Sequence, residues 1–207
     1  MKGLLLKDWY MSIRYCRAFL VLVGVFLVVS FFGNDNLFFR IYPTMIASII
    51  PMSLISYDER DHWTIYSGTL PYTRRQLVSA KYLIGLFFGA FSFLVSLAAF
   101  AVFMITSDTF SIESFLFIAV RLLVLGLIGP TFLLPFVFKF GAEKGRIIFY
   151  VMIGLLSAIG ALLASLGFQN ALTQHSFIIL LVIGGLSVGL YALSWNLSIY
   201  FYQKREL

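Results

Sequence analysis

Six long apolar stretches, separated by short polar ones, run along the chain of 207 residues. A membrane-spanning helix needs about 20 apolar residues, and the apolar positions here are continuous instead of alternating with polar ones as in a transmembrane barrel. The pattern therefore predicts an all-α, polytopic membrane protein, a single transmembrane domain over residues 1–207 with six transmembrane helices. We place the spans at residues 18–33, 37–56, 82–106, 115–138, 147–167 and 177–202.

The first 17 residues precede these stretches and have an amphipathic pattern. Apolar side chains recur every three or four positions, at Leu6, Trp9, Ile13 and Cys16. An apolar face with a cationic rim is typical of a helix that lies in the membrane surface. We therefore predict an N-terminal interfacial helix, with a basic flank before the first span as the alternative. The cations of its rim are Lys2, Lys7, Arg14 and Arg17.

The composition agrees with a membrane protein. Hydrophobic residues make up 61% of the chain and charged residues only 12%, whereas soluble domains carry about 25% charged residues. The net charge of +6 does not indicate nucleic-acid binding, because the basic residues lie beside the ends of apolar stretches, where they can anchor against lipid head groups.

Basic residues also fix the orientation. Of the 15 Lys and Arg residues, all but Arg40 and Arg121 fall on one side of a six-span topology. The positive-inside rule then places both termini and residues 57–81 in the cytoplasm. Arg121 lies inside the fourth span and is a possible intramembrane polar site. We favour snorkelling of Arg121 to the outer surface, beside Asp108 or Glu113, and the same for Arg40.

Residues 57–81 form the longest polar stretch, a predicted cytoplasmic loop. The pattern places Asp58 and Glu59 at a helix start, and Trp63, Tyr66 and Leu70 on one face of a short amphipathic helix. A second helix is expected to begin after an N-cap at Thr73 and to run into the third span. The aromatic face suits either a groove on a partner protein or the membrane surface, and composition alone leaves these two readings nearly even.

The chain lacks the patterns of common catalytic sites. It contains no GxxxxGK[ST], HExxH or GxSxG sequence, and Asp58, Glu59, Asp61 and His62 match no catalytic spacing. The single cysteine and the two distant histidines exclude a metal site built from these residue types. Because the spans also lack a charged relay for an ion-driven carrier, we expect any transport energy to come from elsewhere.

Small residues form a stripe in each of the last two spans. Their spacing lets helix backbones approach closely. We expect packing within one subunit, with a subunit interface as the alternative. The residues are Gly154, Ala158, Ala161 and Ser165 in the fifth span and Gly185, Gly189, Ala192 and Asn196 in the sixth.

The opening sequence MKGLLLKDWY, the loop DERDHWTIYSGTLPYTRRQLVSAKY and the six-span layout together resemble permease subunits of type-2 ATP-binding cassette (ABC) exporters. They are most similar to small permeases of Gram-positive bacteria that export phenol-soluble modulins and other amphipathic or antimicrobial peptides. In the loop, the resemblance rests on an acidic-aromatic segment, a Leu-Pro pair, a basic pair and a Lys-Tyr pair, which are Asp58 to Trp63, Leu70-Pro71, Arg74-Arg75 and Lys81-Tyr82.

The resemblance implies a permease of the bacterial cell membrane that is not itself an enzyme. It implies that two permeases pair, as a homodimer or heterodimer, and that each binds a separate cytoplasmic ATPase. ATP and magnesium would be bound by the ATPase, so this chain is expected to bind no cofactor. Residues 1–17 would be the elbow helix. A non-transporting immunity or sensor protein that binds a peptide or partner is the alternative. The coupling helix that docks on the ATPase would be formed by Asp58, Glu59, Arg60, Asp61, Trp63, Tyr66 and Leu70.

Overall fold

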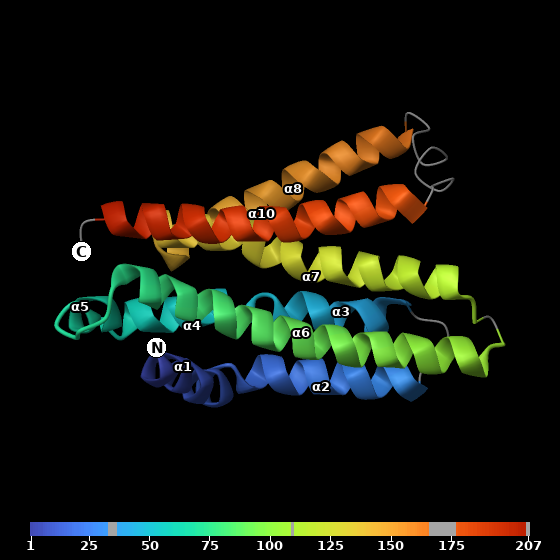
Figure 1. The fold of residues 1–207 in the computed structure, drawn as a ribbon, viewed down its shortest axis with the longest axis horizontal. Helices are drawn as coiled ribbons and strands as arrows, with labels where there is room; N and C mark the ends of the chain where they lie inside the picture. The colour runs from blue at the N-terminus through green and yellow to red at the C-terminus, as the bar shows by residue number, and fades with distance from the viewer. Residues whose placement is uncertain (33–36, 109, 166–176, 206–207) are drawn as a thin grey trace.

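The computed structural model describes residues 1–32, 37–108, 110–165 and 177–205, and within them every regular element is a helix (Figure 1). The connections that the predicted spans leave at residues 34–36 and 168–176 lie outside the described residues. The helices are α1 (Lys2–Tyr15), α2 (Arg17–Phe32), α3 (Leu37–Ala47), α4 (Ile50–Arg60), α5 (Trp63–Ser67), α6 (Arg74–Thr106), α7 (Ile112–Phe140), α8 (Ala142–Ser165) and α10 (Phe177–Lys204).

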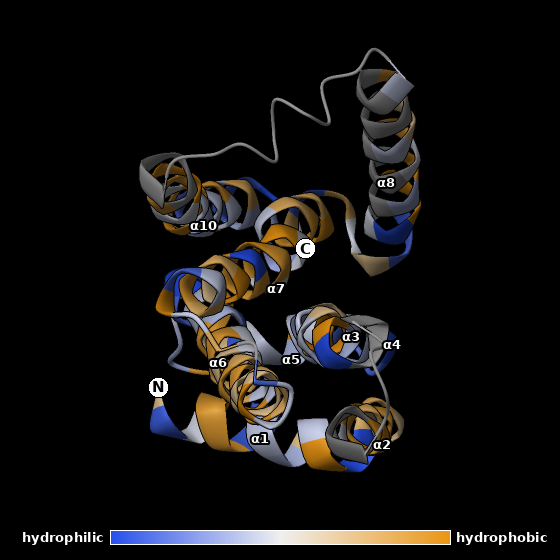
Figure 2. Cartoon of the chain, turned by 90° about the vertical axis from the view of Figure 1, so that its right-hand side faces the viewer, coloured by the Kyte–Doolittle hydropathy of each residue, from blue (hydrophilic) through white to orange (hydrophobic). Residues whose placement is uncertain are grey.

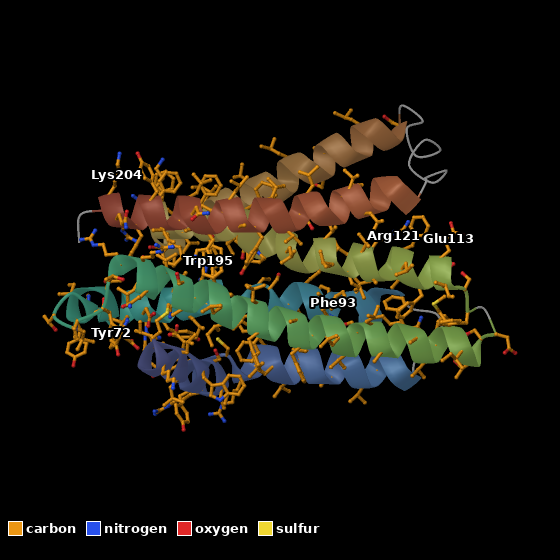
Figure 3. All side chains as sticks on the ribbon, in the orientation of Figure 1. Tyr72, Phe93, Glu113, Arg121, Trp195 and Lys204 are labelled. Carbon is orange, nitrogen blue, oxygen red and sulfur yellow. The ribbon has the colours of Figure 1, made fainter. Side chains whose placement is uncertain are left out.

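Most helices run along the long axis of the molecule, and α5 and both chain ends lie at the same end (Figure 1). We call this the basic end, because it also holds the basic residues at the start of α6 and α8 and at the end of α7 and α10. Lys204 and Tyr72 lie there, whereas Glu113 and Arg121 lie at the opposite end (Figure 3). The structure thus gathers the basic residues as the sequence pattern predicts.

Within the described residues, three helices are long and apolar enough to cross a membrane: α6, α7 and residues 181–204 of α10. A fourth crossing is counted if α1 and the first part of α2, which meet at an angle of 70°, are taken together. Large apolar side chains are also exposed on the helices, for example Val25, Phe91, Leu155 and Leu193. Hydrophobic colouring recurs along α6 and α7 (Figure 2). An exterior of this kind suits lipid better than water.

The predicted second span is divided into α3 and α4. Pro51 occupies the first turn of α4, so it cannot donate a backbone hydrogen bond to the preceding turn, and its ring excludes the carbonyl four residues earlier. The helix therefore breaks at Ser48 and Ile49. Two glycines face this region: a Cβ at Gly85 of α6 would lie 2.5 Å from Pro51 Cγ, and one at Gly129 of α7 would lie 2.7 Å from Ser48 Oγ.

The start of α6 agrees with the sequence prediction. Thr73 Oγ1 accepts the backbone N–H of Gln76, and the Gln76 side chain accepts the N–H of Thr73, which together form a capping box. The spans predicted at residues 115–138 and 147–167 leave a loop of eight residues between them, and this loop is wrong, because α7 and α8 are separated by Gly141 alone. Gly141 has φ of +91°, a conformation open to glycine, so one residue can turn the chain.

The helices pack around α3 and α4, which contact α2, α6 and α7, while α8 leans against α4 and α7. Beyond these contacts α8 diverges from α10 (Figures 1 and 2). The expectation that the small-residue stripes pack within the chain is wrong for their glycines: a Cβ at Gly154, Gly185 or Gly189 would meet no atom within 4 Å. Other glycines, namely Gly85, Gly126, Gly129 and Gly145, lie where a neighbouring segment packs closely against them.

Candidate functional site

A short exposed helix, α5, stands at the basic end between α4 and α6. His62 links α4 to α5 in a left-handed conformation, with φ of +52°, which turns the chain sharply. Ile65 and Tyr66 of α5 are 65% and 56% exposed, while Trp63 and Leu70 are only half-buried. An exposed apolar surface next to charged neighbours suits a contact with a partner protein or with the membrane surface.

Beneath α5 lies a buried cluster of four charged residues from three helices. Lys81 Nζ of α6 lies 2.7 Å from Asp8 Oδ1 of α1 and 2.5 Å from Asp58 Oδ2 of α4. Lys7 Nζ of α1 lies 2.5 Å from Asp58 Oδ1 and 3.6 Å from Asp8 Oδ1. We call Lys7, Asp8, Asp58 and Lys81 the ion cluster.

The ion cluster contains two cations and two anions, so its formal charge is zero. Asp8, Asp58 and Lys81 are buried, and buried charges are tolerated only when they are paired and hydrogen-bonded. Burial, and then the nearby Lys81 ammonium, lower the pKa of Lys7, while the Asp58 and Asp8 carboxylates act in the opposite direction. The arrangement ties the position of α1 to those of α4 and α6.

Lys7 also connects the ion cluster to α5. Its ammonium lies 3.9 Å from the centre of the Trp63 ring, within the range of a cation–π interaction. Trp63 in turn lies beside Tyr66, with ring centroids 5.4 Å apart. A displacement of α5 would therefore act directly on the ion cluster and on the helices that supply its members.

A second set of polar contacts joins the remaining helices at the basic end. Glu59 of α4 accepts a hydrogen bond of 2.9 Å from Arg205 and one of 2.7 Å from the backbone N–H of Ala142, at the start of α8. Arg74, at the start of α6, donates to three backbone carbonyls at the end of α10. A carboxylate at a helix start and a cation at a helix end both match the helix dipole.

These contacts revise the predicted coupling helix. Asp58 and Glu59 lie in the last turn of α4 and not at a helix start, and both are engaged within the chain. Arg60 and Asp61 are exposed and contact each other at 3.5 Å. Leu70 lies beyond the end of α5, so the predicted face of Trp63, Tyr66 and Leu70 is not one helical face. The exposed apolar surface instead consists of Tyr66 and Ile65, and Ile65 was not among the residues predicted from the sequence.

The N-terminal segment is a helix, but its predicted face is only partly right. The buried positions follow a spacing of four, Leu4, Asp8, Ser12 and Cys16, and pack toward the bundle. Leu6 and Ile13 are exposed. The sequence contains one hint that Asp8, the only acidic residue of this basic segment, faces inward. Asp8 lies four residues from Leu4 and from Ser12, and Cys16 follows four residues later, so all four side chains fall on one helix face.

One predicted rim cation and one predicted apolar-face residue of this segment are also engaged inside the protein. Lys7 belongs to the ion cluster, and Trp9 stacks on Phe88 of α6 with ring centroids 5.5 Å apart. Lys2, Arg14 and Arg17 are exposed, so these three could meet lipid phosphates.

The two arginines assigned to the outer side differ from each other. Arg121 is exposed on α7, at the end that also carries Glu113 (Figure 3). Arg40 of α3 is only 2% exposed, and its guanidinium lies 3.5 Å from the centre of the Phe103 ring of α6. The prediction that Arg40 snorkels to the surface is therefore wrong, because the Arg40 side chain turns into the bundle and stacks on an aromatic ring.

The helices and the site define a multi-pass, all-helical membrane protein with a polar, interlocked basic end. A comparison with protein families gives its family: residues 3–203 match the ABC-2 family transporter protein. The match covers nearly the whole chain, so the protein belongs to the ABC-2 transporter family. No curated protein and no solved structure matches the chain significantly.

Proposed function

We propose that this protein is the membrane-spanning subunit of an ATP-driven exporter and that a separate cytoplasmic ATPase docks on α5. The observation that carries the proposal is the exposure of Ile65 and Tyr66 directly above the ion cluster. Family membership supports a permease role. ATP and magnesium would be bound by the ATPase, and this chain would bind neither.

In this proposal the chain crosses the membrane six times, with the basic end in the cytoplasm. The broken α3–α4 segment would be one crossing, since residues 37–60 can extend roughly 36 Å at 1.5 Å per residue. By the same rule the 24 residues of α8 suffice for another. Helix α1 would lie in the membrane surface as the elbow, and two permease copies or homologues would pair.

The contacts at the basic end suggest how force would reach the membrane. A push on α5 would move Trp63 against Lys7, and Lys7 is joined to Asp58 of α4. Glu59, one residue further, holds the start of α8 and the end of α10. Because separating buried charge pairs is costly, α1, α4 and α6 would move together, and the Glu59 contacts would carry α8 and α10 with them.

The cargo we propose is an amphipathic peptide or another amphipathic molecule, on the strength of the resemblance to peptide-exporting permeases. If the chain instead senses or binds a peptide without transport, ATP hydrolysis by a partner would not be needed for its effect. Export measured with a hydrolysis-deficient ATPase separates these two functions.

The docking assignment is tested with two isoleucines of similar exposure at opposite ends of the bundle. Ile65 is 65% exposed on α5, and Ile112 is 72% exposed at the start of α7. The variant Ile65→Asp should abolish co-purification of the ATPase, because a buried apolar anchor would become a desolvated charge. Ile112→Asp, at the far end, should leave co-purification unchanged. Equal behaviour of the two variants, or no ATPase with the wild-type chain, would refute the proposal.

A further inference from the structure

A cavity of about 740 Å³ opens between α2, α4 and α8 near the basic end. This volume falls in the range of small-molecule sites, roughly 300–1,000 Å³. Neither α5 nor the ion cluster contributes to its walls. The lining residues are Phe19, Ile49, Met52, Ser53, Ser56, Tyr57, Glu59, Arg60, Ala142, Glu143, Arg146 and Tyr150.

The cavity is polar at one end and apolar at the other. On α4 the lining changes from Ile49 and Met52 to Arg60, over about 16 Å at 1.5 Å per residue. On α8, which runs in the opposite direction along the chain, it changes from Tyr150 to Arg146 and Glu143 at the helix start. Both helices therefore place their charged residues at the basic end, which matches the order of head group and tail in the membrane leaflet on that side.

Two acidic and two basic side chains line the mouth of the cavity, so their formal charges cancel, and what distinguishes the mouth is the guanidinium donors that remain available. Glu59 is occupied by Arg205 and by the Ala142 N–H, so Glu143 is the carboxylate left to face the opening. Against it stand the guanidinium of Arg60, whose Nε lies 3.5 Å from Asp61 Oδ1 and whose other nitrogens are not used in that contact, and the guanidinium of Arg146. Arg146 uses one donor on Ser56 Oγ, at 2.9 Å, and a guanidinium has five N–H donors in all. Arginine forks fit the oxygens of a phosphate especially well.

We propose that this cavity binds an amphiphile whose head group carries a phosphate, drawn from the membrane leaflet at the basic end. Arg146 and Arg60 hold the phosphate, and the tail rests on the wall formed by Phe19, Ile49 and Met52. The inference goes beyond the proposed function, since it concerns binding by the chain alone and requires no ATPase.

The test is a lipid titration of the purified, detergent-solubilised protein, read by native mass spectrometry. The probes are dioleoyl phosphatidylglycerol, dioleoylglycerol of the same chain length, and free glycerol phosphate. Phosphatidylglycerol should bind at least tenfold more tightly than dioleoylglycerol, which lacks the phosphate, and than glycerol phosphate, which lacks the tail. Equal binding of phosphatidylglycerol and dioleoylglycerol would overturn the proposal.

Three neighbouring positions on α8 give matched variants with different expected results. Arg146→Gln should weaken phosphatidylglycerol binding about tenfold, because a charge-assisted hydrogen bond is lost. Glu143→Gln should strengthen it severalfold, because a repulsive charge is removed. Lys144→Gln should change it by less than about twofold, since Lys144 is exposed outside the cavity.

If Arg146→Gln and Lys144→Gln have equal effects, the lipid responds only to overall charge and the site does not exist. Binding that survives Arg146→Gln and is displaced by an amphipathic peptide would identify a peptide cavity and likewise overturn the assignment. Both results leave the ATPase docking test untouched, so the two proposals fail separately.

Discussion

Replacing Lys81 by methionine tests whether the ion cluster holds the basic end together. Methionine keeps a flexible side chain of similar length but removes the cation that lies between Asp8 and Asp58, at 2.7 and 2.5 Å. The two carboxylates then share only Lys7 and repel each other. The cluster changes from neutral to a net charge of −1 in a buried position.

The expected cost can be worked from these contacts. Removing one partner of a buried ion pair costs about 3–5 kcal/mol, and the lower end applies because Lys7 remains 2.5 Å from Asp58. For a chain of 207 residues, each kcal/mol shifts the melting temperature by about 2–4 °C. We therefore expect Lys81→Met to lower the apparent melting temperature by about 6–12 °C.

The measurement is thermal unfolding of the detergent-solubilised protein, followed by loss of the monodisperse fraction in size-exclusion chromatography. Lys144→Met, at an exposed lysine, is the control and should shift the melting temperature by less than about 2 °C. The double variant Asp8→Asn with Lys81→Met leaves the Lys7–Asp58 pair balanced, so it should recover at least half of the loss.

A shift below about 2 °C for Lys81→Met would refute the reasoning, because it would mean that the lysine is not buried between two charges. Additive losses in the double variant would also refute it. Charges that contact each other must show coupling in such a cycle.

Two further predictions concern helix contacts. Tyr82→Phe removes a hydroxyl that lies 2.7 Å from both Ser194 and Ser198 of α10; it should cost about 1–3 kcal/mol in thermal unfolding, whereas Tyr200→Phe, at an exposed tyrosine, should cost almost nothing. Gly85→Val places a Cβ 2.5 Å from Pro51 Cγ and should destabilise the protein by about 1–3 kcal/mol more than Gly89→Val. The Gly89 control lies one turn along the same helix, where a Cβ meets no atom within 4 Å, so an equal effect would show that α4 and α6 do not pack closely.

The features that depend on the order of residues along the chain were predictable from the sequence. The helical class and the gathering of basic residues at one end follow from hydropathy and charge alone. The start of α6 at Thr73 follows from a capping box that is complete within four residues, and the break near Pro51 follows from the missing N–H of proline. The cap at Thr73 and the break near Pro51 each act over one or two helical turns, so no tertiary contact is needed to specify them.

The roles of the charged residues were decided only by the tertiary structure. Asp58 and Glu59 have the same local pattern whether they face water or a partner within the chain, and their partners Lys7 and Arg205 are 51 and 146 residues away. Arg40 likewise turns inward because Phe103 of another helix lies within reach. Hydropathy along the chain reports which segments prefer lipid, but the pairing of buried charges depends on which helix ends meet in space, and that is set by packing.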